Sequence, residues 1–199
     1  MKNLVVLSVI VCCVSGRPAS AQTSSSFQVA AQVAVARSGE FESSEFGFGG
    51  RLAWTPNLLV GFESEITVYP AEFPNGFAFS GSRIEGLFGL TAGPRLGGLR
   101  PFARLRAGFL HYSGKPIACV AIFPPPLNCL LAAGGNRPIV DLGGGVELFT
   151  GARTFIRADA GDRMVRYPGP SFVGGLRRRR DTGFFGHDLR VAIGAGFRF

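Results

Sequence analysis

Two residues of this 199-residue chain, His111 and Ser113, have side chains and a spacing that could cleave an ester. A serine hydroxyl becomes an effective nucleophile when an imidazole takes its proton, and an acid usually orients that imidazole. Residues two apart on a β-strand point to the same face. The acids expected nearest, Asp141 and Glu147, are expected on the opposite face. The triad is therefore incomplete, and the alternative is a polar pair where a strand becomes a loop.

Cys119 and Cys129 are a second candidate for chemistry, in a segment that also contains the run Pro124–Pro126. Thiols of an exported protein tend to oxidise, so we expect a disulfide that staples a loop. A metal site would need further ligands at suitable spacing, and His111 and His187 are the only histidines of the chain. We therefore expect no metal site and no cofactor.

A third group is a basic tract in the last long connection, which contains four consecutive arginines, Arg177, Arg178, Arg179 and Arg180. One interpretation is a solvated loop. The other is an anion-binding loop that contacts phosphate groups of lipopolysaccharide or another polyanion, because guanidinium groups bind phosphate through paired hydrogen bonds.

Apolar and polar side chains alternate along most of the chain, a pattern that predicts β-strands. Strands are therefore the elements that position these residues. In residues 27–37 one face has Phe27, Val29, Val33 and Val35, and the other has glutamine and alanine. The pattern recurs over 46–54, 58–68, 84–92, 103–109, 140–148, 154–160 and 189–199. We predict eight antiparallel strands. The composition agrees with a β-strand protein. A chain with 29 Gly, 19 Phe and 17% charged residues fits neither a helical soluble domain nor a disordered chain.

The polar faces contain Gly, Ala and opposite charges, which suits a crowded interior better than a surface in water. An eight-stranded barrel has room inside for side chains and little else, and buried charges persist only when paired. We therefore expect an interior charge network. Its acids are Glu63, Glu65, Glu85, Asp141, Glu147, Asp159 and Asp188, and its bases are Arg51, Arg95, Arg104, Arg106, Arg157, Arg163, Arg190 and Arg198.

The connections alternate in length. Residues 38–45, 70–82, 114–137 and 164–186 are predicted as long loops, the first of them acidic with Glu40, Glu42 and Glu45, and 55–57, 97–100 and 150–152 as tight turns. Antiparallel strands joined in this way have all long loops at one end, as in outer membrane barrels. The rival fold is a soluble eight-stranded barrel or sandwich whose apolar faces would point inward.

The start of the chain is typical of a cleaved signal peptide. Lys2 precedes an 11-residue apolar stretch, Leu4–Val14, and Ala19-Ser20-Ala21 is a cleavage pattern. We predict a signal peptide over residues 1–21 and a barrel domain over 22–199. Processing as a lipoprotein at Cys12 or Cys13 is less favoured, because the preceding Val9-Ile10-Val11 lacks the small residues that such processing prefers. No stretch reaches the roughly 20 apolar residues of a transmembrane helix.

The signal, the eight strands, the stretch Asp141–Glu147 and the closing strand Gly194–Phe199 resemble the bacterial outer membrane β-barrel family, small porin-like barrels similar to the OmpA transmembrane domain. The resemblance implies an outer membrane location in a Gram-negative cell, with lipid and lipopolysaccharide as partners. It also implies that the barrel assembly machinery reads the terminal aromatic strand, with Phe197 and Phe199 as its assembly signal. We expect no nucleic-acid partner and a monomer.

Three functions follow from this resemblance. The favoured one is a structural or surface-interaction barrel, without enzymatic activity, that supports membrane integrity and presents extracellular loops. The first alternative is a hydrolase similar to lipid A deacylases, which would use His111 and Ser113. The second alternative is a small porin or channel, which the expected interior ion pairs disfavour unless they switch partners.

Overall fold

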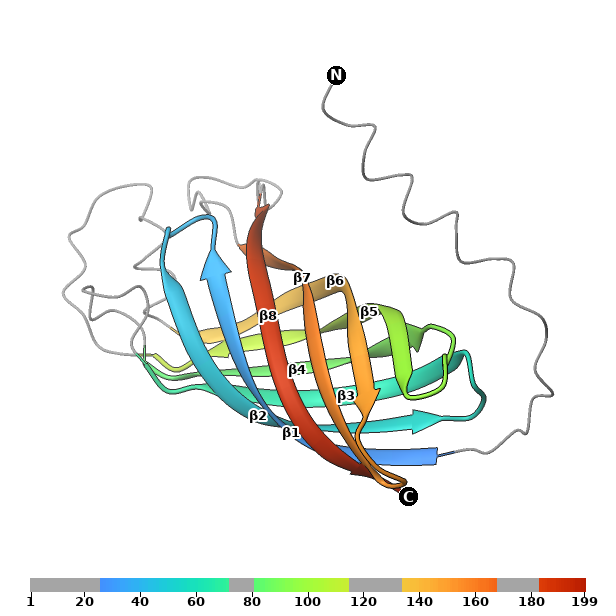
Figure 1. The fold of residues 1–199 in the computed structure, drawn as a ribbon. Coiled ribbons are helices and arrows are strands. Elements are labelled where there is room, and N and C mark those ends of the chain that lie inside the picture. The colour runs from blue at the N-terminus through green and yellow to red at the C-terminus, as the bar shows by residue number, and fades with distance from the viewer. Residues whose placement is uncertain (1–25, 72–80, 115–133, 168–182) are drawn as a thin grey trace, which may run out of the picture.

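The computed structural model describes residues 26–71, 81–114, 134–167 and 183–199. These residues form eight strands: β1 (Ser26–Ser38), β2 (Ser44–Thr55), β3 (Val60–Tyr69), β4 (Arg83–Ala92), β5 (Leu99–Tyr112), β6 (Gly135–Phe149), β7 (Thr154–Tyr167) and β8 (Phe184–Arg198). Each strand pairs with the next, and β8 pairs with β1, so the sheet closes into a barrel (Figure 1). The predicted antiparallel eight-stranded barrel is thus confirmed.

The barrel closes where the two ends of the described chain meet. Along the β1–β8 pair, Val33 lies opposite Ile193. Beyond the ladder, the backbone N–H of Phe199 donates to the carbonyl oxygen of Phe27 at 2.8 Å, and the N–H of Phe27 donates back at 3.2 Å. The last residue of the chain therefore takes part in the closure.

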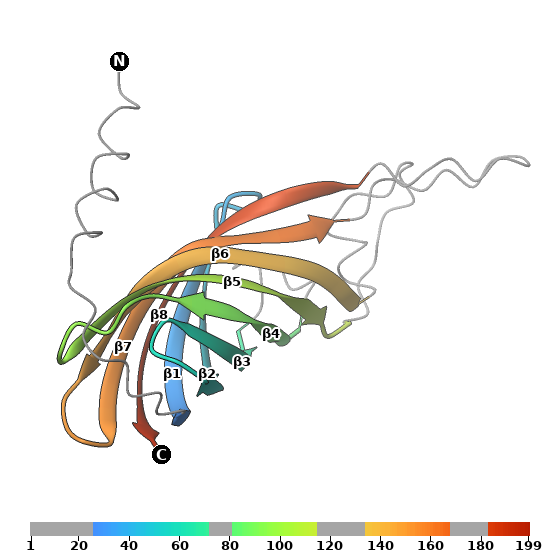
Figure 2. The same cartoon turned by 90° about the vertical axis from the view of Figure 1, so that its right-hand side faces the viewer.

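Short turns cover residues 56–59, 93–98 and 150–153, and they lie at the same end of the barrel as the start of β1 and the end of β8 (Figures 1 and 2). We call this end the turn end and the opposite one the loop end. In the second turn, Gly97 has a φ of 62°, a left-handed conformation that favours glycine. The short turns thus lie together at one end, as expected, but the loop predicted as long over 38–45 is not long: only residues 39–43 separate β1 from β2, fewer than in the 93–98 turn.

Three strands extend further toward the loop end than alternation predicted. β6 begins at Gly135, not at residue 140; β7 continues to Tyr167, not only to Ala160; and β8 begins at Phe184, not at Leu189. The boundaries predicted for the loops 114–137 and 164–186 are therefore wrong. The physical reason is that inward-facing residues near the loop end are apolar, for example Ile139 and Val165, so the contrast between the two faces disappears there.

The barrel has its charges inside and its apolar side chains outside. Thirty large hydrophobic side chains are exposed, most of them along the outer face, including Phe88 at 63% and Ile66 at 61%. The interior is crowded, since a Cβ atom on Gly47 would overlap the ring of the buried Tyr69. Among the residues that the structure describes, no helical segment has the length and hydrophobicity needed for a membrane span.

Candidate functional site

Sixteen charged side chains are buried inside the described part of the barrel, and their charges balance. The eight acids are Glu45, Glu63, Glu65, Glu85, Asp141, Glu147, Asp159 and Asp188, and the eight bases are Arg51, Arg83, Arg100, Arg104, Arg106, Arg157, Arg163 and Arg190. They come from every strand except β1. β1 instead contributes Gln28 and Gln32, and the amide nitrogen of Gln32 donates to the Thr67 hydroxyl at 3.4 Å.

Arg163 is the centre of the network near the loop end. Its guanidinium group contacts Glu45 at 2.6 Å, Glu85 at 2.8 Å and Asp188 at 2.7 Å, so that β2, β4 and β8 are tied to β7. Arg83 forms a second ion pair with Glu45. One arginine thus neutralises carboxylates from three strands.

Arg106 and Arg190 link the middle of the barrel. Arg106 contacts Glu65 at 2.6 Å and Asp141 at 3.0 Å. Arg190 pairs with the same Glu65 and, at 3.1 Å, with Glu85. Because Glu85 also contacts Arg163, the middle and the loop-end parts of the network are continuous.

Arg157 organises the network toward the turn end. It contacts Glu63 at 2.9 Å, Glu147 at 3.3 Å and Asp159 at 2.7 Å, and its guanidinium group lies 4.0 Å from the centre of the Phe102 ring. Glu147 is shared with Arg100 at 3.3 Å. The ion pairs therefore run without a break from Arg100 at the turn end to Arg83 at the loop end.

An apolar layer lies inside the barrel above this network, at the loop end. It consists of Leu87, Leu110, Tyr112, Ile139, Val165 and Tyr167, all at most 3% exposed, with Phe41 packed against them. The hydroxyl groups of Tyr112 and Tyr167 are 3.4 Å apart. Charged side chains and this layer together occupy the interior, which is the arrangement of a plug and not of an aqueous passage.

Thirteen of the fifteen residues expected in the interior charge network lie inside and are buried. Arg95 and Arg198 differ from expectation: Arg95 is exposed in the 93–98 turn and Arg198 is half-buried at the end of β8. Glu45, expected in an acidic loop, is 4% exposed inside the barrel. Strand parity could have found Glu45, because it continues the inward row of Arg51 on β2.

His111 and Ser113 lie on one outward row at the loop end of β5, and both are half-buried. The Nδ1 atom of His111 is 2.8 Å from the side-chain oxygen of Asn136, and the Ser113 hydroxyl is 3.4 Å from that of Ser82. Asp141 points inward and binds Arg104 and Arg106. An amide therefore occupies the place beside His111 where a triad would need a carboxylate.

A second outward histidine has the acidic partner that His111 lacks. The Nδ1 atom of His187 on β8 is 2.7 Å from the carboxylate of Asp162 on β7. The two side chains are 62% and 46% exposed. No alternation pattern predicts this pair.

Aromatic side chains gather outside the barrel at the turn end. The Trp54 ring stacks between Phe27, with ring centres 6.3 Å apart, and Phe62, with ring centres 5.7 Å apart. Phe199 is 74% exposed and Phe197 is 59% exposed on the neighbouring β8 edge. Such rings at one level are typical of the interfacial belt of a membrane protein.

Several predicted features lie outside the described residues: the signal peptide over 1–21, the Cys119–Cys129 disulfide and the arginines 177–180. Within residues 26–71, 81–114, 134–167 and 183–199, no three His, Cys, Asp or Glu side chains are grouped to hold a metal ion.

Comparison with known proteins concerns the fold. No protein-family model matches the chain, and no curated protein sequence does. Among solved structures, the barrel is similar to Neisserial surface protein A, at 12% identity over 88% of this chain and 97% of that one, with a TM-score of 0.55. It is also similar to the N-terminal β-barrel domain of Pseudomonas aeruginosa OprF, at 15% identity over 90% and 99% of the two chains, with a TM-score of 0.50. The resemblance to bacterial outer membrane barrels is thereby confirmed at the level of the fold.

Proposed function

We propose that the chain is an outer membrane β-barrel with a structural or surface-interaction role and a closed interior. The observation that carries the proposal is the inverted distribution of side chains, with thirty large apolar side chains exposed, most of them along the outer face, and sixteen charges buried inside. An apolar outer wall of this extent is stable in lipid and would aggregate in water.

The proposed orientation follows the assembly of this class of barrel. The turn end faces the periplasm and the loop end faces outside. Residues 1–21 are a signal peptide that is removed before the barrel is inserted. The connections after β5 and β7 then present the proposed disulfide of Cys119 and Cys129 and the arginines 177–180 to lipopolysaccharide or environmental partners. The barrel acts as a monomer in this proposal.

The interior favours this role over the two alternatives. A channel would need water to replace the ion pairs that fill the barrel, and the apolar layer around Tyr112 and Tyr167 would have to move as well. A deacylase would need an acid beside His111, where Asn136 lies at 2.8 Å. Neither alternative has an observation that favours it.

Membrane fractionation combined with gel mobility tests the proposal. We expect the protein in the outer membrane fraction and a faster band for the unboiled sample than for the boiled one, because a closed barrel resists detergent. In planar bilayers we expect no steady conductance. A soluble periplasmic protein with equal mobilities, or a steady solute-sized conductance, would refute the proposal.

Replacing Phe199 by alanine is expected to reduce the amount of barrel in the outer membrane of cells while leaving refolding into lipid vesicles unchanged. The side chain is 74% exposed, so it contributes little to packing, whereas the backbone bonds to Phe27 remain. The two readouts are the outer membrane yield and the refolded fraction on gels. Equal yields in cells would show that the terminal aromatic residue is not the assembly signal.

A further inference from the structure

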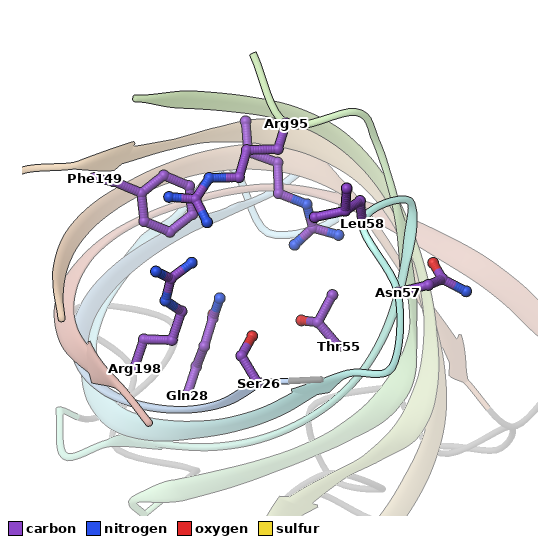
Figure 3. Close-up of a pocket in the computed structure, with 9 residues that line it drawn as sticks. Ser26, Gln28, Thr55, Asn57, Leu58, Arg95, Phe149 and Arg198 are labelled. Atoms are coloured by element: carbon purple, nitrogen blue, oxygen red, sulfur yellow. The ribbon is translucent and has the colours of Figure 1, made fainter. Parts of the chain in front are cut away.

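Three arginines converge on a pocket at the turn end of the barrel. The pocket has a volume of about 30 Å³ and opens to the outside, and Gln28, Arg95, Arg100, Phe149 and Arg198 are among the residues that line it. Figure 3 shows Arg95 and Arg198 extending toward each other beside Phe149, with Gln28 reaching into the same space. Gln28 comes from β1, Arg100 from β5, Phe149 from β6, Arg198 from β8 and Arg95 from the turn after β4.

Each guanidinium group is held in place mainly by uncharged groups. Arg95 donates to the carbonyl oxygen of Gly97 at 3.3 Å, Arg100 to that of Gly93 at 3.3 Å, and Arg198 to that of Ala152 at 3.2 Å. The Phe149 ring lies 4.2 Å from the Arg95 guanidinium carbon and 5.3 Å from that of Arg198. These contacts orient the arginines and leave further N–H groups for a ligand.

Negative charge is scarce around this pocket in the described part of the chain. Glu147 contacts Arg100 at 3.3 Å, but it is shared with Arg157 at the same distance. Arg95 and Arg198 take part in no ion pair with a described carboxylate. Partial burial lowers the pKa of Arg95, the charges of Arg198 and Arg100 lower it further, and the charge of Glu147 raises it.

Two buried polar atoms at the pocket have no hydrogen-bond partner among the described residues. They are the Nη2 atom of Arg100, whose residue is 4% exposed, and the side-chain oxygen of Gln28, whose residue is 3% exposed. A turn of the Gln28 amide exchanges its oxygen and nitrogen, so it can also offer N–H groups. An unsatisfied buried donor such as the Nη2 atom of Arg100 favours binding of an acceptor-rich ligand.

We propose that this pocket binds one small oxyanion, such as a phosphate group, between Arg95, Arg100 and Arg198. Oriented guanidinium groups bind phosphate oxygens through strong charge-assisted hydrogen bonds. The phosphate group could belong to free inorganic phosphate or to a phospholipid headgroup of the periplasmic leaflet. The inference goes beyond the proposed function and depends only on the geometry of the barrel mouth.

Calorimetric titration of inorganic phosphate into the barrel in phosphatidylcholine nanodiscs tests the site. We expect saturable binding of one phosphate per barrel. In the double variant Arg95→Gln/Arg198→Gln we expect affinity to fall by about a hundredfold, since each lost charge-assisted hydrogen bond is worth roughly tenfold. The matched control is Arg153→Gln, an exposed arginine of the neighbouring turn that does not line the pocket.

Absence of saturable binding by the unmodified barrel, or equal binding by the double variant, would overturn the proposal. The double variant and the control should both keep the gel mobility shift, because Arg95, Arg198 and Arg153 do not belong to the sixteen buried charges. A second titration in nanodiscs that contain phosphatidylglycerol separates the sources. If inorganic phosphate binds more weakly in these nanodiscs, the lipid headgroup competes for the pocket and the site is assigned to lipid phosphate. If the binding of inorganic phosphate is unchanged, the site is assigned to free phosphate.

Discussion

Replacing Arg163 by methionine is expected to lower the free energy of unfolding of the barrel by about 3–5 kcal/mol, the usual cost of removing one partner from a buried ion pair. Arg163 is 1% exposed and contacts Glu45, Glu85 and Asp188. Glu45 and Glu85 keep other arginines, Arg83 and Arg190. Asp188 keeps no other ion pair with a described residue, so its charge becomes uncompensated in the interior.

The matched control is Arg51→Met, which removes an arginine that is equally enclosed but poorly paired. Arg51 is 3% exposed, and its closest described carboxylate, that of Glu63, is 3.8 Å away. Glu63 retains Arg157 at 2.9 Å. Urea unfolding in lipid vesicles should therefore show less than half the loss seen for Arg163→Met. Equal losses would mean that burial of the side chain, and not its ion pairs, determines the stability.

Replacing Leu105 by arginine is expected to destabilise the membrane-inserted barrel by about 2–4 kcal/mol, the cost of a lipid-facing cation near the middle of a bilayer. Leu105 is 54% exposed at the centre of β5, and its neighbours across the strands are Leu90 and Leu142. An arginine at this depth would have to bend toward the interface or draw water into the lipid.

The same substitution at Leu148 provides the control, since Leu148 is 48% exposed on the outward face of the neighbouring β6 but lies next to the turn end. Near an interface the cost of the arginine falls to about 0–1 kcal/mol. Unfolding free energies of both variants in the same vesicles give the comparison. If the two variants were equally stable, the outer wall would not be in lipid.

Much of the fold could be predicted from the sequence because a barrel wall gives each strand two chemically different faces. Rows such as Phe27, Val29 and Val33 are continuously apolar, and the opposite row contains residues that the narrow interior accepts. That contrast located all eight strands and the balance of interior charges. It failed where the chemistry of the interior changes, since Leu110, Ile139 and Val165 point inward at the loop end. Strand ends there could not be recognised by alternation.

The candidate site was predicted in outline and not in its pairings. Parity assigns Arg163 and Glu45 to the inside, but only the closed barrel brings together residues that are 118 positions apart. The turn-end arginines were misplaced for a related reason. Parity has no meaning once a strand has ended, and Arg95 lies beyond the end of β4 at Ala92. The outward pair His187 and Asp162 interrupts an otherwise apolar face, so no periodic pattern predicts it.

Trp54, the only tryptophan of the chain, can test whether the outer wall of the barrel lies in lipid. Trp54 is 41% exposed on the outer face of β2, between two phenylalanine rings near the turn end. Brominated acyl chains quench indole fluorescence on contact, and iodide quenches it only from water. Interfacial aromatic side chains should therefore respond to the lipid quencher.

The decisive measurement is the quenching of Trp54 fluorescence in vesicles whose phosphatidylcholine is brominated at shallow or at deep acyl positions. We expect strong quenching by shallow bromines, weaker quenching by deep ones, and little quenching by iodide. Full access to iodide without quenching by either brominated lipid would show that the apolar face is not in the membrane.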